Sequence, residues 1–470
     1  MNSKFDAIVI GTGQAGPALA VKLAAAGNKT AIIERKLFGG TCVNVGCIPS
    51  KTLIASARAA HVARTAADYG VIIEGVIHVD MARVKARKDA VVSQSNLGVS
   101  NWLKSTPNLT VIEGHGRLEG AHAVRVNGDL LTAAKIFINV GGRAMVPDIP
   151  GLADVNYLTN ANMMDVDFLP EHLVIIGGSY IGLEFAQMYR RFGSRVTVLE
   201  NGPRIVSRED EEISTAVQNI LEKEGIEFWL NAKNLHVSSR DGGIVVSTSG
   251  NASHEVAGSH LLLAVGRVPN TDDLGLDKAG VRTNERGYIE VDDQLCTNVP
   301  GIWALGDVNG RGAFTHTSYN DYEIVAANLP DGDKDRLPRS LKDRIPCYAL
   351  FIDPPLARVG MNTREAQTWM QKTANKVLIG KMMMTRVGRA RERGETQGFM
   401  SVLVDAESRK ILGATLLGIE GDEAIHCILD VMAADAPYTV IQRAMHIHPT
   451  VSELIPTLLG SLQPLAEETA

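Results

Sequence analysis

Short apolar runs alternate with amphipathic stretches along the N-terminal part of the chain. The run from Asp6 to Ile10 is mostly apolar and rich in β-branched residues, which predicts a buried strand. A helical pattern from Pro17 to Ala26 follows, and Gly27 ends it. A second apolar run covers Thr30 to Ile33. A strand, a helix and a strand in this order predict a βαβ unit of a parallel sheet.

The loop between the first strand and the helix carries Gly11, Gly13 and Gly16, which form a GxGxxG motif. Glu34 ends the second strand, 23 positions after Gly11. Such glycines let the backbone approach a pyrophosphate at the helix N-terminus, and an acid about 20 residues later accepts hydrogen bonds from a ribose. The motif alone can be an ordinary turn. With these flanks it predicts a dinucleotide site.

The same pattern recurs near the middle of the chain. An apolar run from Leu173 to Ile176 precedes a loop with Gly177 and Gly182, and Glu200 again stands 23 positions after the first glycine. A helix is predicted up to residue 192, and a strand over 195–199. Ser179 replaces the middle glycine of the motif. Because serine is small, we still predict a second dinucleotide unit, in which a pyrophosphate approaches less closely.

Weaker signals predict the remaining organisation. Asn127-Gly128-Asp129 is typical of a hairpin turn, here between strands over 123–126 and 130–140. Ser207 and Asp210 predict the start of a helix in a pattern similar to a capping box, and Gly225 ends that helix. The charged stretch 332–339 predicts an exposed linker. Beyond it, alternating runs over 400–404 and 411–417 and a helical tract from 422 predict a separate α+β domain.

Composition narrows the class of partner. The chain has 470 residues, with 47 Lys and Arg against 53 Asp and Glu, a formal net charge of −6. This balance disfavours nucleic acid and anionic membranes as partners. No apolar run approaches the roughly 18 residues of a membrane helix, and the first glycine loop begins too early to leave room for a signal peptide. We therefore expect a cytoplasmic protein.

Two of the five cysteines are close in sequence. They are Cys42 and Cys47, and the others are scattered, which argues against a secreted disulfide scaffold. A C-x4-C pair can hold zinc, but a tetrahedral site needs two more ligands, and no nearby Cys-x-x-Cys or His-x-x-x-His pair supplies them. We therefore predict no metal site. Beside a dinucleotide unit, the spacing favours a catalytic disulfide.

The sequence GGTCVNVGCIPSK at 39–51 closely resembles the redox-active disulfide motif of the class I pyridine nucleotide-disulfide oxidoreductases, the family of lipoamide dehydrogenase, glutathione reductase and mercuric reductase. The resemblance continues in four further segments. These are residues 140–142 (VGG), 265–270 (VGRVPN), 304–307 (ALGD) and 446–453 (HIHPTVSE). It therefore spans nearly the whole chain.

The resemblance implies an α/β fold with two Rossmann-like dinucleotide-binding domains and a C-terminal α+β dimerisation domain. The implied order is a first FAD-binding part over 1–150, an NAD(P)-binding domain over 151–270, a return to the FAD domain over 271–344 and a dimer interface domain over 345–470. It implies a homodimer that uses FAD and NADH, with NADPH possible. The NADH preference follows from Glu200, because a carboxylate repels the 2′-phosphate of NADPH.

The resemblance also implies the cofactor-binding residues. The first loop and Glu34 would hold FAD, Asp307 would bind its ribityl chain, and the second loop and Glu200 would hold the nicotinamide dinucleotide. The full expected set is Gly11, Gly13, Gly16, Glu34, Gly40, Thr41, Lys51, Gly142, Asp307, Gly177, Gly182, Glu200 and Gly266.

By the same resemblance, electrons run from NAD(P)H through FAD to a Cys42–Cys47 disulfide and then to a substrate. Cys47 would face the flavin, and Cys42 would attack the substrate. A neighbouring cation lowers the pKa of a thiol, so Lys51, expected to pair with Glu184, suits this chemistry. Tyr180 lies four positions before Glu184 on one helix face and would cover the flavin.

The resemblance assigns acid–base work to the C-terminal segment. His448 and Glu453 would form the pair, and His446 would have a supporting part. A histidine oriented by a carboxylate suits a general acid or base near neutral pH. In this family the pair serves the disulfide of the other subunit.

The electron acceptor stays open. Lipoamide dehydrogenase agrees with both cysteine and histidine motifs, but residues 314–323 (FTHTSYNDYE) depart from its small-residue version. They look more like a mercuric-reductase-like branch that includes flavoprotein disulfide reductases linked to reactive chlorine and hypothiocyanous acid resistance, as does 354–360 (PPLARVG). Mercuric reductase itself is disfavoured, because the chain lacks a C-terminal cysteine pair. A flavin redox sensor without a dedicated substrate is the alternative from another class, and the His448–Glu453 pair argues against it.

Overall fold

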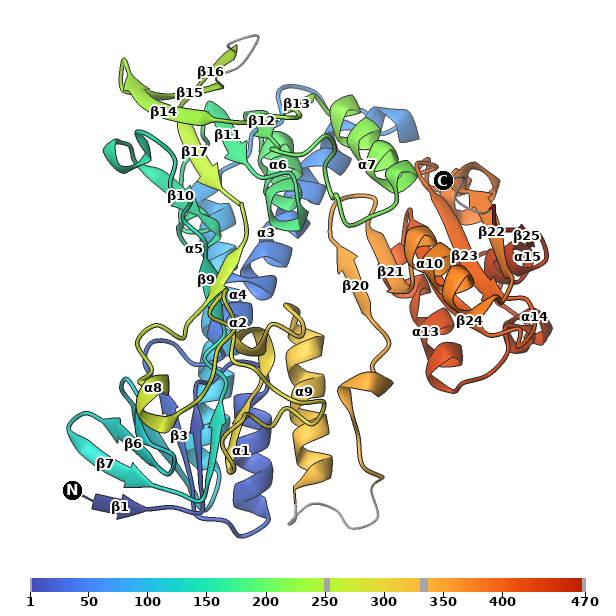
Figure 1. Ribbon diagram of the computed structural model, residues 1–470. Helices are drawn as coiled ribbons and strands as arrows, with labels where there is room; N and C mark the ends of the chain where they lie inside the picture. Colours follow the sequence, from blue (N-terminus) through green and yellow to red (C-terminus); the bar gives the residue numbers. More distant parts are fainter. Residues whose placement is uncertain (1, 249–253, 330–336, 467–470) are drawn as a thin grey trace.

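Two parallel sheets and one antiparallel sheet form the framework of the computed structural model, which describes residues 2–248, 254–329 and 337–466. Figure 1 shows the two parallel sheets stacked along one side and the antiparallel sheet beside them. The predicted α/β fold, with two dinucleotide units and an α+β C-terminal part, is confirmed.

The first parallel sheet has the order β19-β8-β2-β3-β4. Its strands are β2 (Ala7–Ile10), β3 (Thr30–Glu34), β4 (Leu109–Glu113), β8 (Lys135–Ile138) and β19 (Ile302–Ala304), and helices α1 (Gly16–Ala25) and α9 (Thr315–Asn328) pack against it. Its central strand β2 is buried along its whole length, as expected of a parallel strand covered on both faces. The strand β19 arrives from far along the sequence, so two distant segments complete this sheet.

The second parallel sheet has the order β10-β17-β11-β12-β13. Its strands are β10 (Tyr157–Thr159), β11 (His172–Ile176), β12 (Arg195–Leu199), β13 (Ile226–Trp229) and β17 (His260–Leu263), with helices α5 (Asn160–Met163), α6 (Tyr180–Phe192) and α7 (Glu211–Lys223). An antiparallel sheet of β14 (Leu235–Arg240), β15 (Gly243–Thr248) and β16 (His254–Gly258) lies at one end. The strands β9 (Gly142–Ala144) and β18 (Arg267–Pro269) pair where the chain passes between the two parallel sheets.

The third sheet is antiparallel, with the order β20-β21-β24-β23-β22-β25. Its strands are β20 (Cys347–Leu350), β21 (Leu356–Gly360), β22 (Val377–Met383), β23 (Phe399–Asp405), β24 (Ile411–Leu417) and β25 (Gln463–Pro464). The helices of this part are α10 (Thr363–Thr373), α11 (Gly388–Glu392), α12 (Gly421–Ala424), α13 (His426–Ala433), α14 (Thr439–Arg443) and α15 (Ile455–Leu459). A separate core of buried apolar side chains holds it together.

Two long helices run between the parallel sheets. They are α3 (Cys47–Arg64), which follows the short α2 (Gly40–Val45), and α4 (Met81–Ser105). The remaining elements are β1 (Asn2–Lys4), β5 (Arg117–Gly120), β6 (Ala123–Val126), β7 (Asp129–Thr132) and α8 (Leu276–Ala279). Among the described residues, every helix is too short or too polar to cross a lipid bilayer.

Two sequence predictions need correction. The predicted strand over 130–140 is two strands, because β7 pairs with β6 in the hairpin whereas β8 pairs with β2 in the parallel sheet. The helix expected from Ser207 begins only at Glu211, and the side chain of Asp210 makes no cap hydrogen bond to it. Asp210 Oδ2 instead accepts from the backbone N–H of Thr363 at 3.1 Å. A tertiary contact has replaced the local one.

Two other expectations stay predictions. The linker over 332–339 lies largely outside the described residues. The domain limits at 150, 270 and 344 stay predictions.

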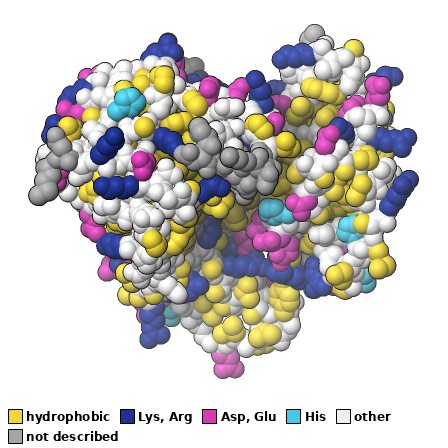
Figure 2. All heavy atoms as spheres, turned by 90° about the horizontal axis from the view of Figure 1, so that it is seen from below, with side chains coloured by type: hydrophobic (Ala, Val, Ile, Leu, Met, Phe, Trp, Pro, Cys, Tyr) yellow, Lys and Arg dark blue, Asp and Glu magenta, His cyan; other side chains and the backbone are white. Residues whose placement is uncertain are grey.

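Figure 2 shows the molecule from below, where a hollow separates its largest masses and charged side chains gather along part of the hollow.

Candidate active site

Cys42 and Cys47 meet where two helices join. Cys42 lies on α2 and Cys47 begins α3, with Gly46 between the helices. A Cβ at Gly46 would lie 2.8 Å from the carbonyl oxygen of Thr41, so only glycine permits this sharp junction. Cys42 is half-buried, Cys47 is exposed, and both are thiols in this structure. The local fold therefore brings the predicted pair together.

The two thiols share a hydrogen bond, and this makes them unequal. The bond from Cys42 is the main cause that lowers the pKa of Cys47, to about 6, against the opposing effect of burial. Thr315 Oγ1, 3.2 Å from Cys47 Sγ, and the charge of Lys51 lower it further. The same hydrogen bond, followed by burial, raises the pKa of Cys42. Cys47 is therefore the thiolate at neutral pH, and Cys42 carries the proton.

Lys51 and Glu184 form the predicted ion pair. Lys51 Nζ lies 2.8 Å and 3.0 Å from the two carboxylate oxygens of Glu184. The backbone N–H of Phe351 also donates to Glu184 Oε1 at 3.0 Å, and Lys51 Nζ lies 4.5 Å from the centre of the Phe351 ring. The pair joins α3, which carries Cys47, to α6 of the second dinucleotide unit.

Tyr180 stands at the first position of α6. Its hydroxyl donates to Glu209 Oε1 at 2.8 Å, and its ring lies near Phe314 and Tyr348, at centroid distances of 6.4 Å and 5.5 Å. Burial raises the pKa of Tyr180. The sequence analysis did not single out Glu209 or Tyr348, because neither belongs to a recognisable motif.

The first glycine loop is tightly built. Gly11 has φ of 101°, and a Cβ there would lie 2.3 Å from the carbonyl oxygen of Asn139. A Cβ at Gly13 would lie 2.8 Å from Asn139 Oδ1, and one at Gly16 would lie 2.3 Å from the Gly11 oxygen. Asn139 Oδ1 accepts the Gly16 N–H at 2.9 Å, while Asn139 Nδ2 donates to Leu305 O at 2.7 Å. Asn139, which the sequence analysis missed, thus fixes the loop.

The acid of the first unit is also held in place. Glu34 Oε2 accepts from the backbone N–H and hydroxyl of Thr12, at 3.0 Å and 2.6 Å, and Glu34 Oε1 accepts from the N–H of Lys36 at 2.8 Å. Each carboxylate oxygen can accept more than one hydrogen bond. The side chain is therefore oriented beside the glycine loop with capacity for a ribose hydroxyl.

The other expected FAD residues gather around this loop. A Cβ at Gly40 would lie 2.9 Å from the Gly13 Cα, so the two backbones pack directly together, and Thr41 follows on α2. Arg267 donates to the carbonyl oxygen of Gly142, and its Nε lies 3.6 Å from Asp307 Oδ2. Burial raises the pKa of Asp307.

These residues fit FAD. A Cβ at any of the three glycines would collide with Asn139 or with the Gly11 carbonyl oxygen, so only glycine lets the loop turn tightly into α1, and the helix N-terminus formed there suits a pyrophosphate. Asp307 is a partly buried carboxylate whose Oδ2 lies 3.6 Å from Arg267 Nε, and polyol hydroxyls suit such an acceptor.

The second glycine loop repeats this geometry. Gly177 has φ of 114°, and a Cβ there would lie 2.4 Å from the carbonyl oxygen of Ala264. A Cβ at Gly182 would lie 2.0 Å from the Gly177 oxygen. Glu200 Oε2 accepts from Gly178 N and Glu200 Oε1 from Gly202 N, both at 2.8 Å. Gly266, also expected to bind cofactor, follows nearby with φ of 130°. The arrangement fits a second dinucleotide.

His448 and Glu453 are paired at the surface. His448 Nδ1 lies 2.9 Å and 3.1 Å from the two oxygens of Glu453. The His448 side chain is 80% exposed, and the neighbouring Met445 and Ile447 are 98% and 79% exposed. Within the part of the chain that the structure describes, no hydrogen bond links His448 to either cysteine.

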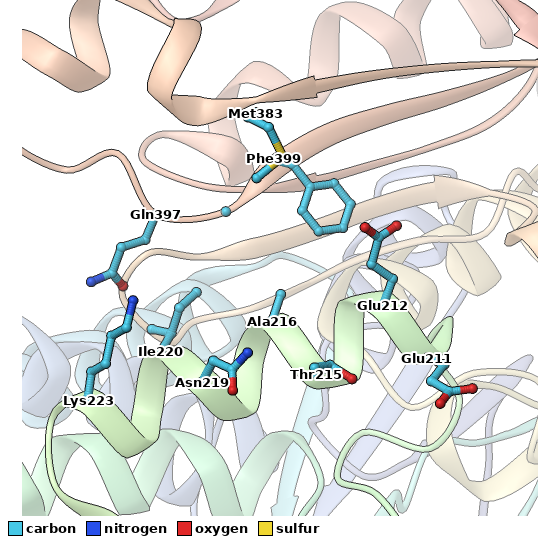
Figure 3. Close-up of a pocket in the computed structure, with 11 residues that line it drawn as sticks. Glu211, Glu212, Thr215, Ala216, Asn219, Ile220, Lys223, Met383, Gln397 and Phe399 are labelled. Carbon is cyan, nitrogen blue, oxygen red and sulfur yellow. The ribbon is translucent and has the colours of Figure 1, made fainter.

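The molecule also has a groove of about 710 Å³ between α7 and the six-stranded antiparallel sheet of the C-terminal part. Figure 3 shows Phe399 and Met383 on one side facing Ala216 and Ile220 of α7 on the other. The residues that line it include none of the predicted site residues. Over the described ranges, no group of three or more His, Cys, Asp or Glu side chains is placed to hold a metal ion.

Comparison with known families accounts for almost the whole chain. Residues 5–321 match the model described as pyridine nucleotide-disulphide oxidoreductase, and residues 347–459 match the dimerisation domain of the same name.

Relatives with different names align along nearly their full lengths. A protein of Escherichia coli (strain K12) named probable pyridine nucleotide-disulfide oxidoreductase RclA is 36% identical over 467 residues, covering 97% of this chain and 99% of that protein. Dihydrolipoyl dehydrogenase of Chlamydia muridarum is 32% identical, with 97% and 96% covered, and mercuric reductase of Streptomyces lividans is 33% identical, with 96% and 94% covered. The solved Cu(II) complex of the HOCl-induced flavoprotein disulfide reductase RclA from Escherichia coli superimposes with a TM-score of 0.87 at 35% identity, covering 97% of this chain and 99% of that one.

Proposed function

The chain belongs to the pyridine nucleotide-disulphide oxidoreductase family, and we propose that Cys42 and Cys47 are the redox-active pair through which it works. It is an NAD(P)H-dependent flavoprotein disulfide oxidoreductase. The observation that carries the proposal is the placement of the two thiols at the junction of α2 and α3, where Cys47 Sγ lies 3.2 Å from Thr315 Oγ1 and α3 also carries Lys51, paired with Glu184 at 2.8 Å.

The two dinucleotide units would hold the two cofactors. FAD would lie on the first loop, against Glu34, Gly40, Thr41, Lys51, Gly142 and Asp307, and the nicotinamide dinucleotide would lie on the second loop, against Glu200 and Gly266. When bound, FAD supplies a carrier that takes two electrons from NAD(P)H and passes them to the disulfide. We infer NADH as the preferred donor, because Glu200 is anchored by two backbone N–H groups where a 2′-phosphate would lie.

The cysteines would then exchange with an acceptor disulfide in two steps. The Cys42 thiolate attacks one sulfur of the acceptor, which forms a mixed disulfide and releases one thiolate. The Cys47 thiolate attacks the Cys42 sulfur, which closes the Cys42–Cys47 disulfide and releases the second thiolate. Two electrons leave the protein, and each released thiolate takes up one proton.

Cys42 needs a base, because its pKa is raised. His448 is suited to this, since Glu453 holds its Nδ1 and leaves Nε2 to take and return the proton. The pair is exposed, and the C-terminal part matches a dimerisation domain. We therefore infer a homodimer in which His448 of the partner subunit serves Cys42. We infer a cytoplasmic location from the cysteine pattern, because the three cysteines outside the Cys42–Cys47 pair are scattered along the sequence and do not resemble a secreted disulfide scaffold.

The acceptor class that fits is a disulfide or a small oxidant. One relative, RclA of Escherichia coli, is 36% identical and is described as an HOCl-induced flavoprotein disulfide reductase with a Cu(II) complex, and this supports an acceptor from oxidant chemistry. Lipoamide, a cyclic disulfide, is the second candidate acceptor, because the His448–Glu453 pair is present. Mercury(II) is disfavoured, since no cysteine follows Cys427 in the sequence.

Mixed dimers test the proposal. Cys42→Ala dimers should be inactive with NADH and a disulfide, and His448→Ala dimers should be slower by roughly 10²–10⁴-fold, the usual contribution of a positioned acid–base group. Heterodimers of one chain of each kind should regain about half of wild-type turnover, because one site is complete.

The matched control is a heterodimer of a wild-type chain and a chain with both substitutions. If the histidine acts across the interface, this control is inactive. Half activity in the control, with none in the first heterodimer, would place His448 and Cys42 in one chain and overturn the proposed arrangement.

A further inference from the structure

Glu209 is a buried carboxylate that several parts of the molecule share. It lies in the loop between β12 and α7, and its side chain is 1% exposed. Glu209 Oε1 accepts from the hydroxyl of Tyr180 at 2.8 Å and from the hydroxyl of Tyr348. Glu209 Oε2 lies 3.3 Å from Arg358 Nη1. We call Glu209, Tyr180, Tyr348 and Arg358 the Glu209 hub.

The hub joins the second dinucleotide unit to the C-terminal part. Tyr180 and Glu209 belong to the former, whereas Tyr348 on β20 and Arg358 on β21 belong to the latter. The same loop is fixed again by the contact of Asp210 with the N–H of Thr363. Because Glu209 is anchored from outside its own unit, it gives Tyr180 a partner whose position does not depend on the dinucleotide loop.

Tyr180 lies between the second glycine loop and the cysteines. It directly follows that loop, and its ring lies 6.4 Å from the ring of Phe314, which precedes Thr315, the residue in contact with Cys47. Phe314 and Tyr348 stack at 5.5 Å with an interplanar angle of 9°. Tyr180 therefore stands between the second glycine loop and the segment that contacts Cys47, where its ring would cover a nicotinamide held by that loop.

The charge balance shows that Tyr180 is not needed to neutralise Glu209. Arg358 supplies the opposite charge, and Arg358 Nη1 also donates to the Tyr348 hydroxyl at 3.1 Å. Arg358 Nη2 is held separately by Glu365 at 2.8 Å. The ion pair and Tyr348 form a connected set without Tyr180. The hydroxyl of Tyr180 can leave Glu209 while the rest of the hub stays paired.

We propose that Glu209 is a positioning residue that latches Tyr180 over the nicotinamide site. The inference rests on the proposed function, in which the second unit holds the nicotinamide dinucleotide. Entry of the nicotinamide ring breaks the hydrogen bond from Tyr180 to Glu209, so part of the binding free energy of the ring is spent on opening the latch. The latch weakens binding of the intact dinucleotide and leaves binding of its ADP-ribose part unchanged.

Binding measurements on the FAD-loaded protein test this without turnover. Calorimetry with NAD⁺ and with ADP-ribose, which lacks the nicotinamide ring, gives the Kd of each ligand for wild type and for Tyr180→Phe. The variant keeps the ring and loses the hydrogen bond to a charged acceptor. We expect NAD⁺ to bind about 10-fold more tightly to Tyr180→Phe, with the Kd of ADP-ribose unchanged within 2-fold.

Tyr348→Phe is the matched control, because it removes the same kind of hydroxyl from the same carboxylate oxygen and leaves Tyr180 bound. We expect the Kd of NAD⁺ to change less than 2-fold in this variant. Equal tightening in both tyrosine variants, parallel changes for both ligands, or no tightening in Tyr180→Phe would overturn the latch. If NAD⁺ and ADP-ribose fail to compete for one site on the wild-type protein, the proposed function of the second unit is wrong. The proposed role of Glu209 is then wrong as well, because it depends on that function.

Discussion

The glycine loops of the two dinucleotide units make nearly the same backbone contacts. The N–H of Gly11 donates to Ile33 O at 2.7 Å, and that of Gly177 donates to Leu199 O at 2.8 Å. The strand next to each loop supplies the carbonyl that excludes a side chain from the first glycine, from Asn139 in one unit and Ala264 in the other. Both acids are held by backbone N–H groups.

The units differ at the equivalent positions of Asn139 and Ala264. The N–H of each donates to the end of the central strand at 2.8 Å, so the two residues have the same place. The amide of Asn139 reaches over the first loop, and a Cβ at Gly13 would collide with it. Ala264 has no such group, so Ser179 fits where the first unit needs glycine. The departure from GxGxxG in the second unit therefore has a tertiary cause.

This difference fits the proposed assignment, in which the first unit retains FAD and the second exchanges the nicotinamide dinucleotide. Asn139 also donates to Leu305, so the first loop is tied to the segment that returns to its sheet and carries Asp307. The second loop has Ala264 at this position instead, and beside it Tyr180 donates a hydrogen bond to Glu209. A closed site suits a bound flavin, and an openable one suits a substrate that must leave in each cycle.

The largest effect is expected from Gly13→Ala in the first unit. Its Cβ would displace Asn139 Oδ1 and leave the buried Gly16 N–H and Leu305 C=O without a partner. We expect FAD affinity to fall about 10²-fold, because each unpaired buried group costs about 1–3 kcal/mol. The ratio of flavin to protein absorbance measures retained FAD. Ser179→Ala is the control and should keep full FAD, and equal FAD loss in both variants would contradict the comparison.

A second prediction concerns the thiol pair, which follows only the first unit. The rate of alkylation of Cys47 in the reduced protein should reach half its maximum near pH 6, because only the thiolate reacts. Below that pH the rate should fall about tenfold per pH unit. Cys42→Ala removes the hydrogen bond that lowers this pKa. The midpoint should then rise toward the ordinary thiol value of about 8.5. Peptide mapping of iodoacetamide-treated protein identifies the alkylated residue, and an unshifted midpoint would show that the pair is not coupled.

The smallest expected effect separates the two acids. Glu200→Ala should reduce the ratio of kcat/KM for NADH to that for NADPH by roughly 10-fold, about 1.4 kcal/mol, because the variant no longer repels a 2′-phosphate. Arg204, nearby on the same loop, limits the size of the effect. Glu34→Ala should leave this ratio unchanged while weakening FAD binding. A wild-type preference for NADPH would show that Glu200 does not select the donor.

Local pattern was sufficient for much of the framework. The βαβ units and the hairpin turn at Asn127-Gly128 each depend on a few consecutive residues whose backbone geometry is set by sterics. The pairing of Lys51 with Glu184 was expected only from the family resemblance, since nothing local relates positions so far apart.

The two glycine loops, the acids that follow them and the close cysteine pair could be predicted from the sequence, because each depends on residues that are near one another in the chain. The sequence analysis misplaced the start of α7 and ran β7 and β8 together, since an apolar run does not show where the chain changes sheet. Tertiary packing was needed to show that Asn139 excludes a side chain at Gly13, and that Tyr180, Tyr348 and Arg358 converge on Glu209. Such contacts arise when separate elements pack, and the energy of a buried hydrogen bond depends on partners that no local pattern records.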